Sequence, residues 1–276
     1  MYSFIFLILS TFYVVEAPRV ELVRDITYYE SPSADARKHK LDLYLPASRR
    51  DFPVVVFVHG GGWSQGDKNY WFDLYGKIGR SFAGEGIGVA VINYRLSPKV
   101  MNPEQASDVA QAIGWVSKNI SKYGGKPEQL FLAGHSAGGH LVSLVSSDPT
   151  YLEKVGLKPG NVNGVISISG VYDVQDDNPL FERVFGKTID KRHLCSPINH
   201  VKEGLPPFLI LHGDHELPFC DGPCAEKFYG KLKDCRNNCR LMPIPERNHM
   251  SIIARIAETN DPGQQAILQF IRTSKP

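Results

Sequence analysis

The stretch Leu130-Phe131-Leu132-Ala133-Gly134-His135-Ser136-Ala137-Gly138-Gly139-His140 is the most informative part of this sequence. Its apolar start predicts a buried strand, and the run 141–145 that follows is compatible with a helix. Gly134, Ser136 and Gly138 therefore form a G-x-S-x-G turn between a strand and a helix, which is typical of a nucleophile elbow. We interpret Ser136 as a candidate nucleophile. The alternative, a glycine-rich turn that cradles a phosphate, lacks the lysine of a P-loop.

A second glycine-rich segment, His59-Gly60-Gly61-Gly62-Trp63, directly follows the apolar run Val54–Val58. Adjacent glycines leave backbone N–H groups unshielded, and such groups can stabilise the negative charge that develops on a carbonyl oxygen. The expected donors of this oxyanion hole are the N–H groups of Gly61, Gly62 and Ala137. We expect Trp63 to shape the adjoining pocket and His59 to be a structural hydrogen-bonding residue.

A serine hydroxyl becomes a good nucleophile when a neighbouring base takes its proton. The chain has nine histidines. In the order serine, acid, histidine, the base follows the strand that carries the acid. Only His249 lies beyond the last predicted strand, on a loop just before the helix start at 251–253. The sequence therefore predicts His249 as the base.

The acid that orients this histidine is expected just after the apolar strand Phe208–Leu211. The carboxylates in that region are Asp214, Glu216 and Asp221. Glu216 is favoured because it lies slightly beyond the end of the strand. Asp214 is the main alternative and Asp221 the third, so the choice between Glu216 and Asp214 stays open.

Short apolar runs alternate with helical patterns along most of the chain, which favours an α/β fold with a doubly wound, mostly parallel eight-stranded sheet. The first two runs alternate in polarity and predict an antiparallel edge pair. The segment 171–205 has no clear strand, and we expect it to be a small cap in a single domain of residues 18–276. The predicted strands are Val20–Tyr29, Lys40–Leu45, Val54–Val58, Val89–Asn93, Leu130–Ala133, Gly164–Ser169, Phe208–Leu211 and Arg240–Ile244.

One helix has a clear predicted start and end. Asn102 is expected to cap it, with Pro103 in the first position and Gln105 at the third. Its apolar stripe runs from Ala106 to Ile120, and Gly124-Gly125 is expected to end it. A last helix is predicted after Pro262.

Four of the five cysteines form a C-x3-C, C-x3-C pattern: Cys220, Cys224, Cys235 and Cys239. Zinc ribbons prefer two-residue gaps, so two disulfides are the favoured interpretation. Three pairings are possible, among them a nested one that joins Cys220 to Cys239 and Cys224 to Cys235. Cys195 is left over.

Residues 1–17 have no charged side chain before Glu16 and suit a secretory signal peptide cut after Ala17. We therefore expect a secreted protein; if this run is only an apolar extension, a cytoplasmic location is the alternative. The 276 residues carry 31 Lys+Arg against 29 Asp+Glu, a net charge of +2. This balance gives no reason to expect a nucleic-acid partner, and the sequence predicts no stable membrane span.

Five stretches resemble α/β-hydrolases of the hormone-sensitive-lipase-like group of carboxylesterases, with a closer likeness to carboxylesterase/feruloyl-esterase-type enzymes and kynurenine formamidase. In the order of that family, they are His59–Trp63, Asn93–Pro98, Gly134–His140, Pro206–Asp214 and Asn248–Ser251. The resemblance implies the α/β-hydrolase fold and says little about the substrate. The family usually has Asp where this chain has Glu216, although Glu serves in some relatives. Arg95 and Asp108 also match and are interpreted as a structural ion pair.

These observations lead us to expect a cofactor-free and metal-free serine hydrolase that acts on a small-molecule carboxylic ester with short or medium acyl or aryl groups. An arylformamide is the alternative substrate within the same mechanism. A non-catalytic ligand-binding module on the same fold and a zinc hydrolase are the competing interpretations. The oligomeric state is left open.

Overall fold

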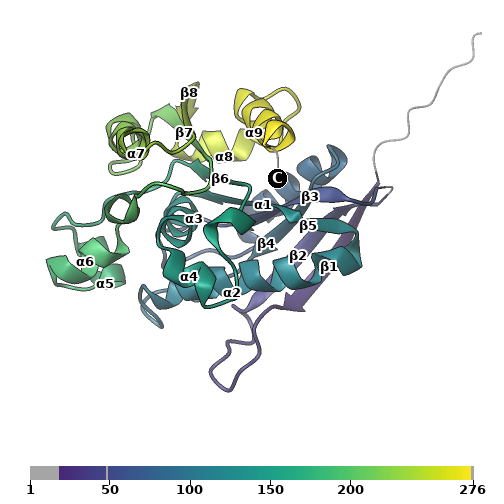
Figure 1. Cartoon of the computed structure of the whole chain (residues 1–276), viewed down its shortest axis with the longest axis horizontal. Helices are drawn as coiled ribbons and strands as arrows, with labels where there is room; N and C mark the ends of the chain where they lie inside the picture. The colour runs from purple at the N-terminus through teal and green to yellow at the C-terminus, as the bar shows by residue number, and fades with distance from the viewer. Residues whose placement is uncertain (1–18, 48, 275–276) are drawn as a thin grey trace, which may run out of the picture.

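The computed structural model describes residues 19–47 and 49–274. The predicted signal peptide of residues 1–17 lies outside the described residues. In the described part of the chain, eight strands form one sheet in the order β1-β2-β4-β3-β5-β6-β7-β8 (Figure 1). They are β1 (Val20–Thr27), β2 (Lys40–Pro46), β3 (Phe52–Val58), β4 (Gly88–Ile92), β5 (Gly125–His135), β6 (Gly164–Ile168), β7 (Phe208–His215) and β8 (Cys239–Asn248).

The strand directions agree with the predicted mostly parallel sheet. β1 pairs with β2, and β2 with β4, in antiparallel fashion, whereas every other neighbouring pair is parallel. The antiparallel edge pair is thus confirmed. In β3, Val54, Val56 and Val58 belong to one core cluster, while Val55 and Phe57 belong to the other. This is why that strand is apolar on both faces.

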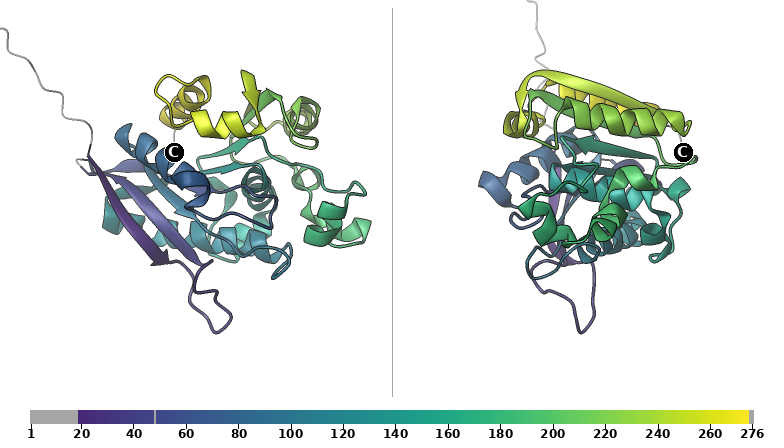
Figure 2. Two further views of the ribbon diagram at one scale, coloured as in Figure 1. Left: turned by 180° about the vertical axis from the view of Figure 1, so that it is seen from behind. Right: turned by 90° about the vertical axis from the view of Figure 1, so that its left-hand side faces the viewer.

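Helices cover both faces of the sheet (Figures 1 and 2). Apolar side chains of α1, α8 and α9 pack on one face, and those of α2, α3 and α7 pack on the other. None of the helices within the described ranges is long and apolar enough to span a membrane. The helices named here are α1 (Tyr70–Gly84), α2 (Glu104–Asn119), α3 (Ala137–Ser147), α4 (Pro149–Glu153), α7 (Gly222–Asp234), α8 (His249–Arg255) and α9 (Pro262–Thr273).

The segment 171–205 contains two short helices, α5 (Pro179–Phe185) and α6 (Ile189–Cys195), and a 3₁₀ turn over Pro197–His200. Figure 1 shows α5 and α6 next to each other at one end of the molecule. The ring of Phe185 lies 4.9 Å from that of Trp63, centroid to centroid. The segment therefore packs against the loop that follows β3.

The predicted cap of α2 is wrong. The helix begins at Glu104, and no side chain caps its first turn. Asn102 donates its backbone N–H to Val184 O of α5 at 3.0 Å, and its buried side chain has no hydrogen-bond partner. Gln105 donates its side-chain amide to Trp63 O at 2.9 Å. Contacts with α5 and the Trp63 loop therefore replace the local capping box.

The prediction of two disulfides is not borne out, because all five cysteines are unpaired in the described residues. Helix α7 gives a physical reason for excluding the nested pairing. Cys224 lies in the first turn of α7 and Cys235 directly follows its end, so the helix holds these two residues roughly 16 Å apart. A disulfide needs Cα atoms closer than about 7 Å.

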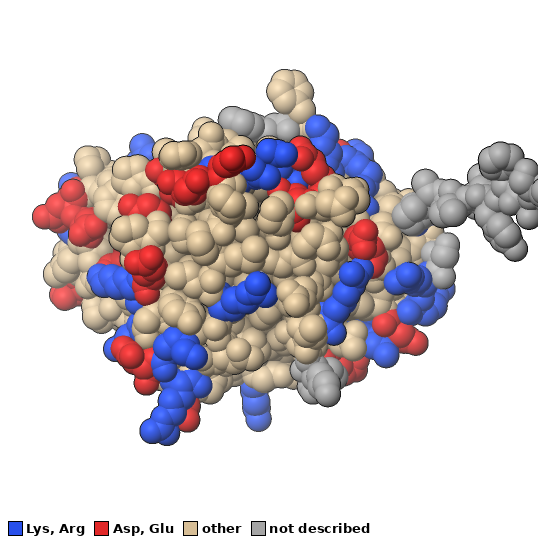
Figure 3. All heavy atoms as spheres, turned by 90° about the horizontal axis from the view of Figure 1, so that it is seen from above, with Lys and Arg blue, Asp and Glu red and all other residues tan. Residues whose placement is uncertain are grey.

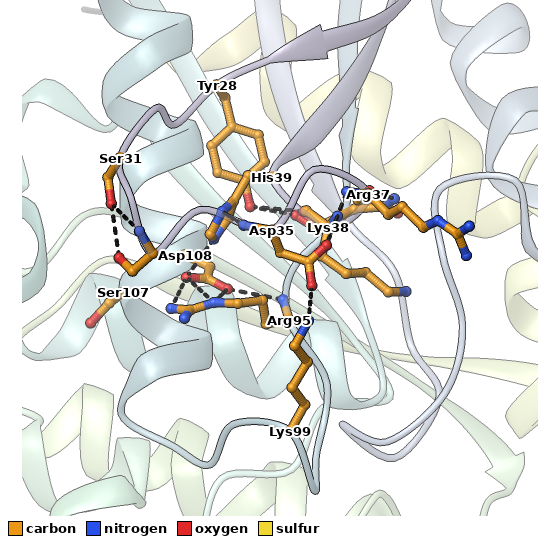
Figure 4. A network of polar contacts seen from close by, with 12 residues as sticks. Tyr28, Ser31, Asp35, Arg37, Lys38, His39, Arg95, Lys99, Ser107 and Asp108 are labelled. Carbon is orange, nitrogen blue, oxygen red and sulfur yellow. Dashed lines mark hydrogen bonds and ion pairs between the residues drawn. The ribbon is translucent and has the colours of Figure 1, made fainter.

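The predicted ion pair between Arg95 and Asp108 is present (Figure 4). Arg95, just after β4, donates to both carboxylate oxygens of Asp108 on α2 at 2.7 and 2.9 Å. His39, just before β2, faces the same carboxylate at 3.1 Å. The pair joins three segments that are distant in sequence, away from the cavity described below. On the face in Figure 3, positive and negative side chains are interspersed, in keeping with the net charge of +2.

Candidate active site

Ser136 lies on the turn between β5 and α3 with φ 55° and ψ −118°, a strained conformation for a residue other than glycine. The flanking glycines allow close backbone contact. A Cβ at Gly134 would lie 2.3 Å from Gly138 O, and one at Gly138 would lie 2.1 Å from Val58 O. The turn therefore has the backbone that the G-x-S-x-G pattern predicts.

His249 and Glu216 are in direct contact. His249 Nδ1 lies 2.6 Å from Glu216 Oε2, and the Glu216 side chain is fully buried. Burial raises the pKa of Glu216, but hydrogen bonds from His249, Ser169 and the Gly213 N–H outweigh it and hold that pKa below its ordinary value. An ionised carboxylate only accepts hydrogen bonds, so Nδ1 of His249 is the donor. The other ring nitrogen, Nε2, is then free to take a proton.

The other two candidate acids have different partners. Asp214 accepts the backbone N–H groups of Glu246 and Arg247 at 2.9 and 3.0 Å. Asp221 caps α7 by accepting the N–H of Cys224 at 3.2 Å. Of the three, the structure brings Glu216 to the histidine.

A cavity of about 280 Å³ lies at the carboxyl ends of the parallel strands. The predicted residues that line it are Gly61, Gly62, Trp63, Ser136 and His249. Glu216 is buried beside His249, and Ala137 is buried at the start of α3. Ser136 and His249 share this cavity, but the described side chains form no direct hydrogen bond to each other. Cys220 also lines this cavity.

The walls of the cavity are mostly apolar and aromatic. Among its described lining residues there is no Asp, Glu, Lys or Arg. The segment 171–205 contributes Val171, Asn178, Leu180 and Phe181. The remaining apolar and aromatic lining residues include Tyr70, Leu74, Tyr75, Leu217, Pro218, Phe219 and Met250.

The glycine-rich loop after β3 is held at several points. Gly60 N donates to the Tyr75 hydroxyl at 2.8 Å, and Trp63 Nε1 donates to His140 Nδ1 at 3.2 Å. Trp63 is 2% exposed, so it is part of the packed wall. Gly61 and Gly62 have φ values of 117° and 57°, which favour glycine. The loop is thus fixed beside Ser136.

His59 is fully buried and stacks on Tyr94 with the two ring centroids 4.5 Å apart. Its Nδ1–H donates to Gly60 O at 2.7 Å. Burial lowers the pKa of His59 to about 4, so the ring is neutral near pH 7. These contacts agree with a structural role.

Three residues near the site were not predicted from the sequence. Ser169 donates to Glu216 Oε1 at 2.5 Å. His135 donates its Nε2–H to His249 O at 2.9 Å, and burial lowers the pKa of His135 to about 3. Cys220 is buried in the cavity wall. The sequence indicates these residues only weakly, because its one clue is position: Ser169 and His135 each lie at or just after the carboxyl end of a predicted strand.

The match to known families covers most of this architecture. The model of the BD-FAE family matches residues 41–221, which include β2 apart from its first residue, β3 to β7 and the whole elbow. The chain belongs to the BD-FAE family. This agrees with the resemblance to hormone-sensitive-lipase-like α/β-hydrolases seen in the sequence.

Several curated proteins resemble this BD-FAE chain. It is 34% identical to the esterase LipC of Mycobacterium tuberculosis, over 79% of this chain and 58% of that protein. The chain is 29% identical to the isoprenylcysteine alpha-carbonyl methylesterase ICME of Arabidopsis thaliana, over 72% of this chain and 50% of that protein. The chain is also 26% identical to the kynurenine formamidase of Danio rerio, over 90% of this chain and 83% of that protein. The chain spans between about half and three fifths of the length of the first two relatives.

Solved structures support the fold of this BD-FAE member. A truncated carbohydrate esterase from gut microbiota superposes with a TM-score of 0.78 at 20% identity, covering 94% of this chain and 98% of that one. Esterase B from Lactobacillus rhamnosis superposes with a TM-score of 0.76 at 24% identity, covering 92% of this chain and 84% of that one. The chain therefore has the α/β-hydrolase fold, as expected from the sequence.

Proposed function

We propose that this chain is a serine hydrolase that cleaves carboxylic esters with short to medium acyl groups or aryl groups. The observation that carries the proposal is the 2.6 Å contact between Glu216 and His249 at the wall of the cavity that also contains Ser136. An ionised acid that fixes a histidine tautomer beside a serine on a strained turn is the arrangement that activates a hydroxyl nucleophile.

In this mechanism the Ser136 hydroxyl turns toward His249, gives its proton to Nε2 and attacks the ester carbonyl. Hydrogen bonds between catalytic groups are often long or poorly aligned before substrate binds. The N–H groups of Gly61, Gly62 and Ala137 stabilise the oxyanion of the tetrahedral intermediate. His249 then protonates the leaving alcohol, and a water molecule hydrolyses the acyl-enzyme by the same route. Glu216 stays ionised and stabilises the imidazolium.

The cavity suits an uncharged, apolar group. Its volume of about 280 Å³ lies just below the roughly 300–1,000 Å³ usual for ligand pockets. Its described lining residues include no Asp, Glu, Lys or Arg, so a buried charge on the substrate would find no ionic partner. This supports short acyl or aryl esters over long lipids.

The similarity to the kynurenine formamidase of Danio rerio favours one second candidate, an arylformamide, because the same mechanism cleaves formamides. N-formylkynurenine carries an ammonium and a carboxylate, which the uncharged cavity would have to leave in solvent. We expect it to react more slowly than neutral aryl esters.

The experiment measures kcat/KM for p-nitrophenyl esters of increasing acyl length, a feruloyl ester and N-formylkynurenine. We expect the highest kcat/KM with a short or medium acyl ester, and a loss of at least about 10³-fold in kcat for Ser136→Ala. Ser143→Ala, at a buried serine of α3 bonded to Gly139 O, is the matched control and should keep its activity. Turnover that survives Ser136→Ala, or no turnover of any ester, would contradict the proposal.

A further inference from the structure

The carboxyl end of β6 contacts both halves of the candidate active site. Ile168 O accepts the N–H of Ser136 at 2.9 Å. The next residue, Ser169, donates its N–H to Leu211 O on β7 at 2.7 Å. β7 leads directly into the loop that carries Glu216. Two consecutive residues thus connect the nucleophile turn to the strand before the acid.

The side chain of Ser169 extends this connection to the acid itself. Its hydroxyl donates to Glu216 Oε1 at 2.5 Å, and Gly213 N donates to the same oxygen at 2.9 Å. His249 contacts the other oxygen, Oε2. Both oxygens of the buried carboxylate therefore have donors, which fixes the plane of the carboxylate relative to the imidazole. Hydrogen bonds to an ionised oxygen are stronger than those between neutral groups.

The backbone at Ser169 is strained, which indicates that the serine hydroxyl is required at this position. Ser169 has φ 48° and is 1% exposed. Glycine adopts this left-handed region at no steric cost, and strained residues that persist there cluster at functional sites. At this position glycine would relieve the backbone strain but would provide no hydroxyl for Glu216.

We propose that Ser169 is a positioning residue of the reaction: its hydroxyl holds Glu216 in the orientation that aligns His249 with Ser136. This inference rests on the proposed function, since it assigns Ser169 a role through the acid of the triad. Ser169 touches neither the substrate nor the reacting atoms, so its effect should appear in kcat and leave KM nearly unchanged.

The test is a double-mutant cycle between Ser169→Gly and Glu216→Gln. We expect Ser169→Gly to lower kcat about tenfold, the size expected for losing one hydrogen bond to a charged group, with an unfolding temperature close to that of the wild type. In the Glu216→Gln background, the same change should lower kcat by less than about twofold, because the two residues act as one unit.

Ser167→Ala is the matched control. Ser167 is also buried on β6, and its hydroxyl bonds the Tyr172 hydroxyl at 2.8 Å in place of Glu216. We expect it to change kcat less than about twofold. The proposal is overturned if Ser169→Gly keeps wild-type kcat, or if it lowers kcat by the same factor with and without Glu216.

A proton NMR measurement separates this inference from the proposed function. The His249 Nδ1 proton, which is shared with Glu216, should give a resonance far downfield, and Ser169→Gly should move or broaden it while Ser167→Ala leaves it unchanged. This holds even if no ester is cleaved. A resonance that is unaltered in Ser169→Gly would overturn the positioning role whatever the activity assays show.

Discussion

Asp214 and Glu216 are two residues apart at the end of β7, and they have different hydrogen-bond partners. Asp214 accepts two backbone N–H groups of the β8 end, whereas Glu216 accepts from His249. We expect Glu216→Gln to lower kcat by about 10³–10⁴, because the amide no longer fixes the tautomer or balances the imidazolium. Asp214→Asn should change kcat by less than about threefold. Steady-state kinetics with one p-nitrophenyl ester would check both, and the reverse order would make Asp214 the acid.

Cys220 lies in the wall of the cavity that also contains Ser136. Burial together with the charge of Glu216 raises the pKa of its thiol. A methylthio group added there would occupy space in the cavity that also contains Ser136. We therefore expect methyl methanethiosulfonate to inactivate the protein slowly, and faster as the pH rises and the thiolate fraction grows.

The loss of activity is followed against time at several pH values. Cys224→Ala, which removes the neighbouring thiol, should be inactivated like the wild type, whereas Cys220→Ala should resist. Equal inactivation of Cys220→Ala and the wild type would mean that the reagent acts elsewhere.

Chain order led us to predict Ser136, His249 and, as the favoured acid, Glu216, because these residues follow β5, β8 and β7 in a known topology. Ser169 and Cys220 could not be selected in this way. The contact of Ser169 with Glu216 spans 47 positions in the sequence. A serine at a strand end and a cysteine near a helix start are common, so only the three-dimensional contact distinguishes them.

Among the elements, the central strands were easiest to predict, since burial on both faces leaves a continuous apolar run. Their ends were harder. β5 extends from Gly125 to His135, well beyond the predicted Leu130–Ala133, because its polar start pairs with the beginning of β3. The prediction that Asn102 caps α2 was wrong for a related reason, because contacts with α5 decide where Asn102 lies.

The G-x-S-x-G turn packs closely against the end of β3. At Gly138 a Cβ would overlap Val58 O at 2.1 Å, so Gly138→Ala must push α3 away from β3. We expect it to destabilise the fold by about 3 kcal/mol or to prevent soluble expression. The free energy of unfolding in urea measures this.

Gly160 is the matched control, because a Cβ there meets nothing within 4 Å. Gly160→Ala should stay within about 0.5 kcal/mol of the wild type. A Gly138→Ala protein as stable as the Gly160→Ala protein would mean that β3 and α3 are less tightly packed than described.

At the scale of the whole molecule, the Asp108 carboxylate joins the segment before β2, the segment after β4 and helix α2 (Figure 4). Burial raises the pKa of Asp108, but hydrogen bonds from His39 and Arg95 outweigh it, so that pKa lies below its ordinary 3.8. A carboxyl group with a lowered folded pKa stabilises the fold above its unfolded pKa. That stability is lost as the pH falls through the folded value.

We therefore expect Asp108→Asn to lower the free energy of unfolding by about 3 kcal/mol at pH 7, because it leaves Arg95 and His39 without their anion. The difference from the wild type should stay constant down to about pH 4 and shrink below it, as the wild-type carboxyl takes up its proton. Urea unfolding at a series of pH values measures this difference. Glu226→Gln, at an exposed carboxylate on α7, should follow the wild type throughout. A difference that instead grew below pH 4 would show that protonated Asp108 is more stabilising than the ion pair, so that the network would not be what joins these three segments.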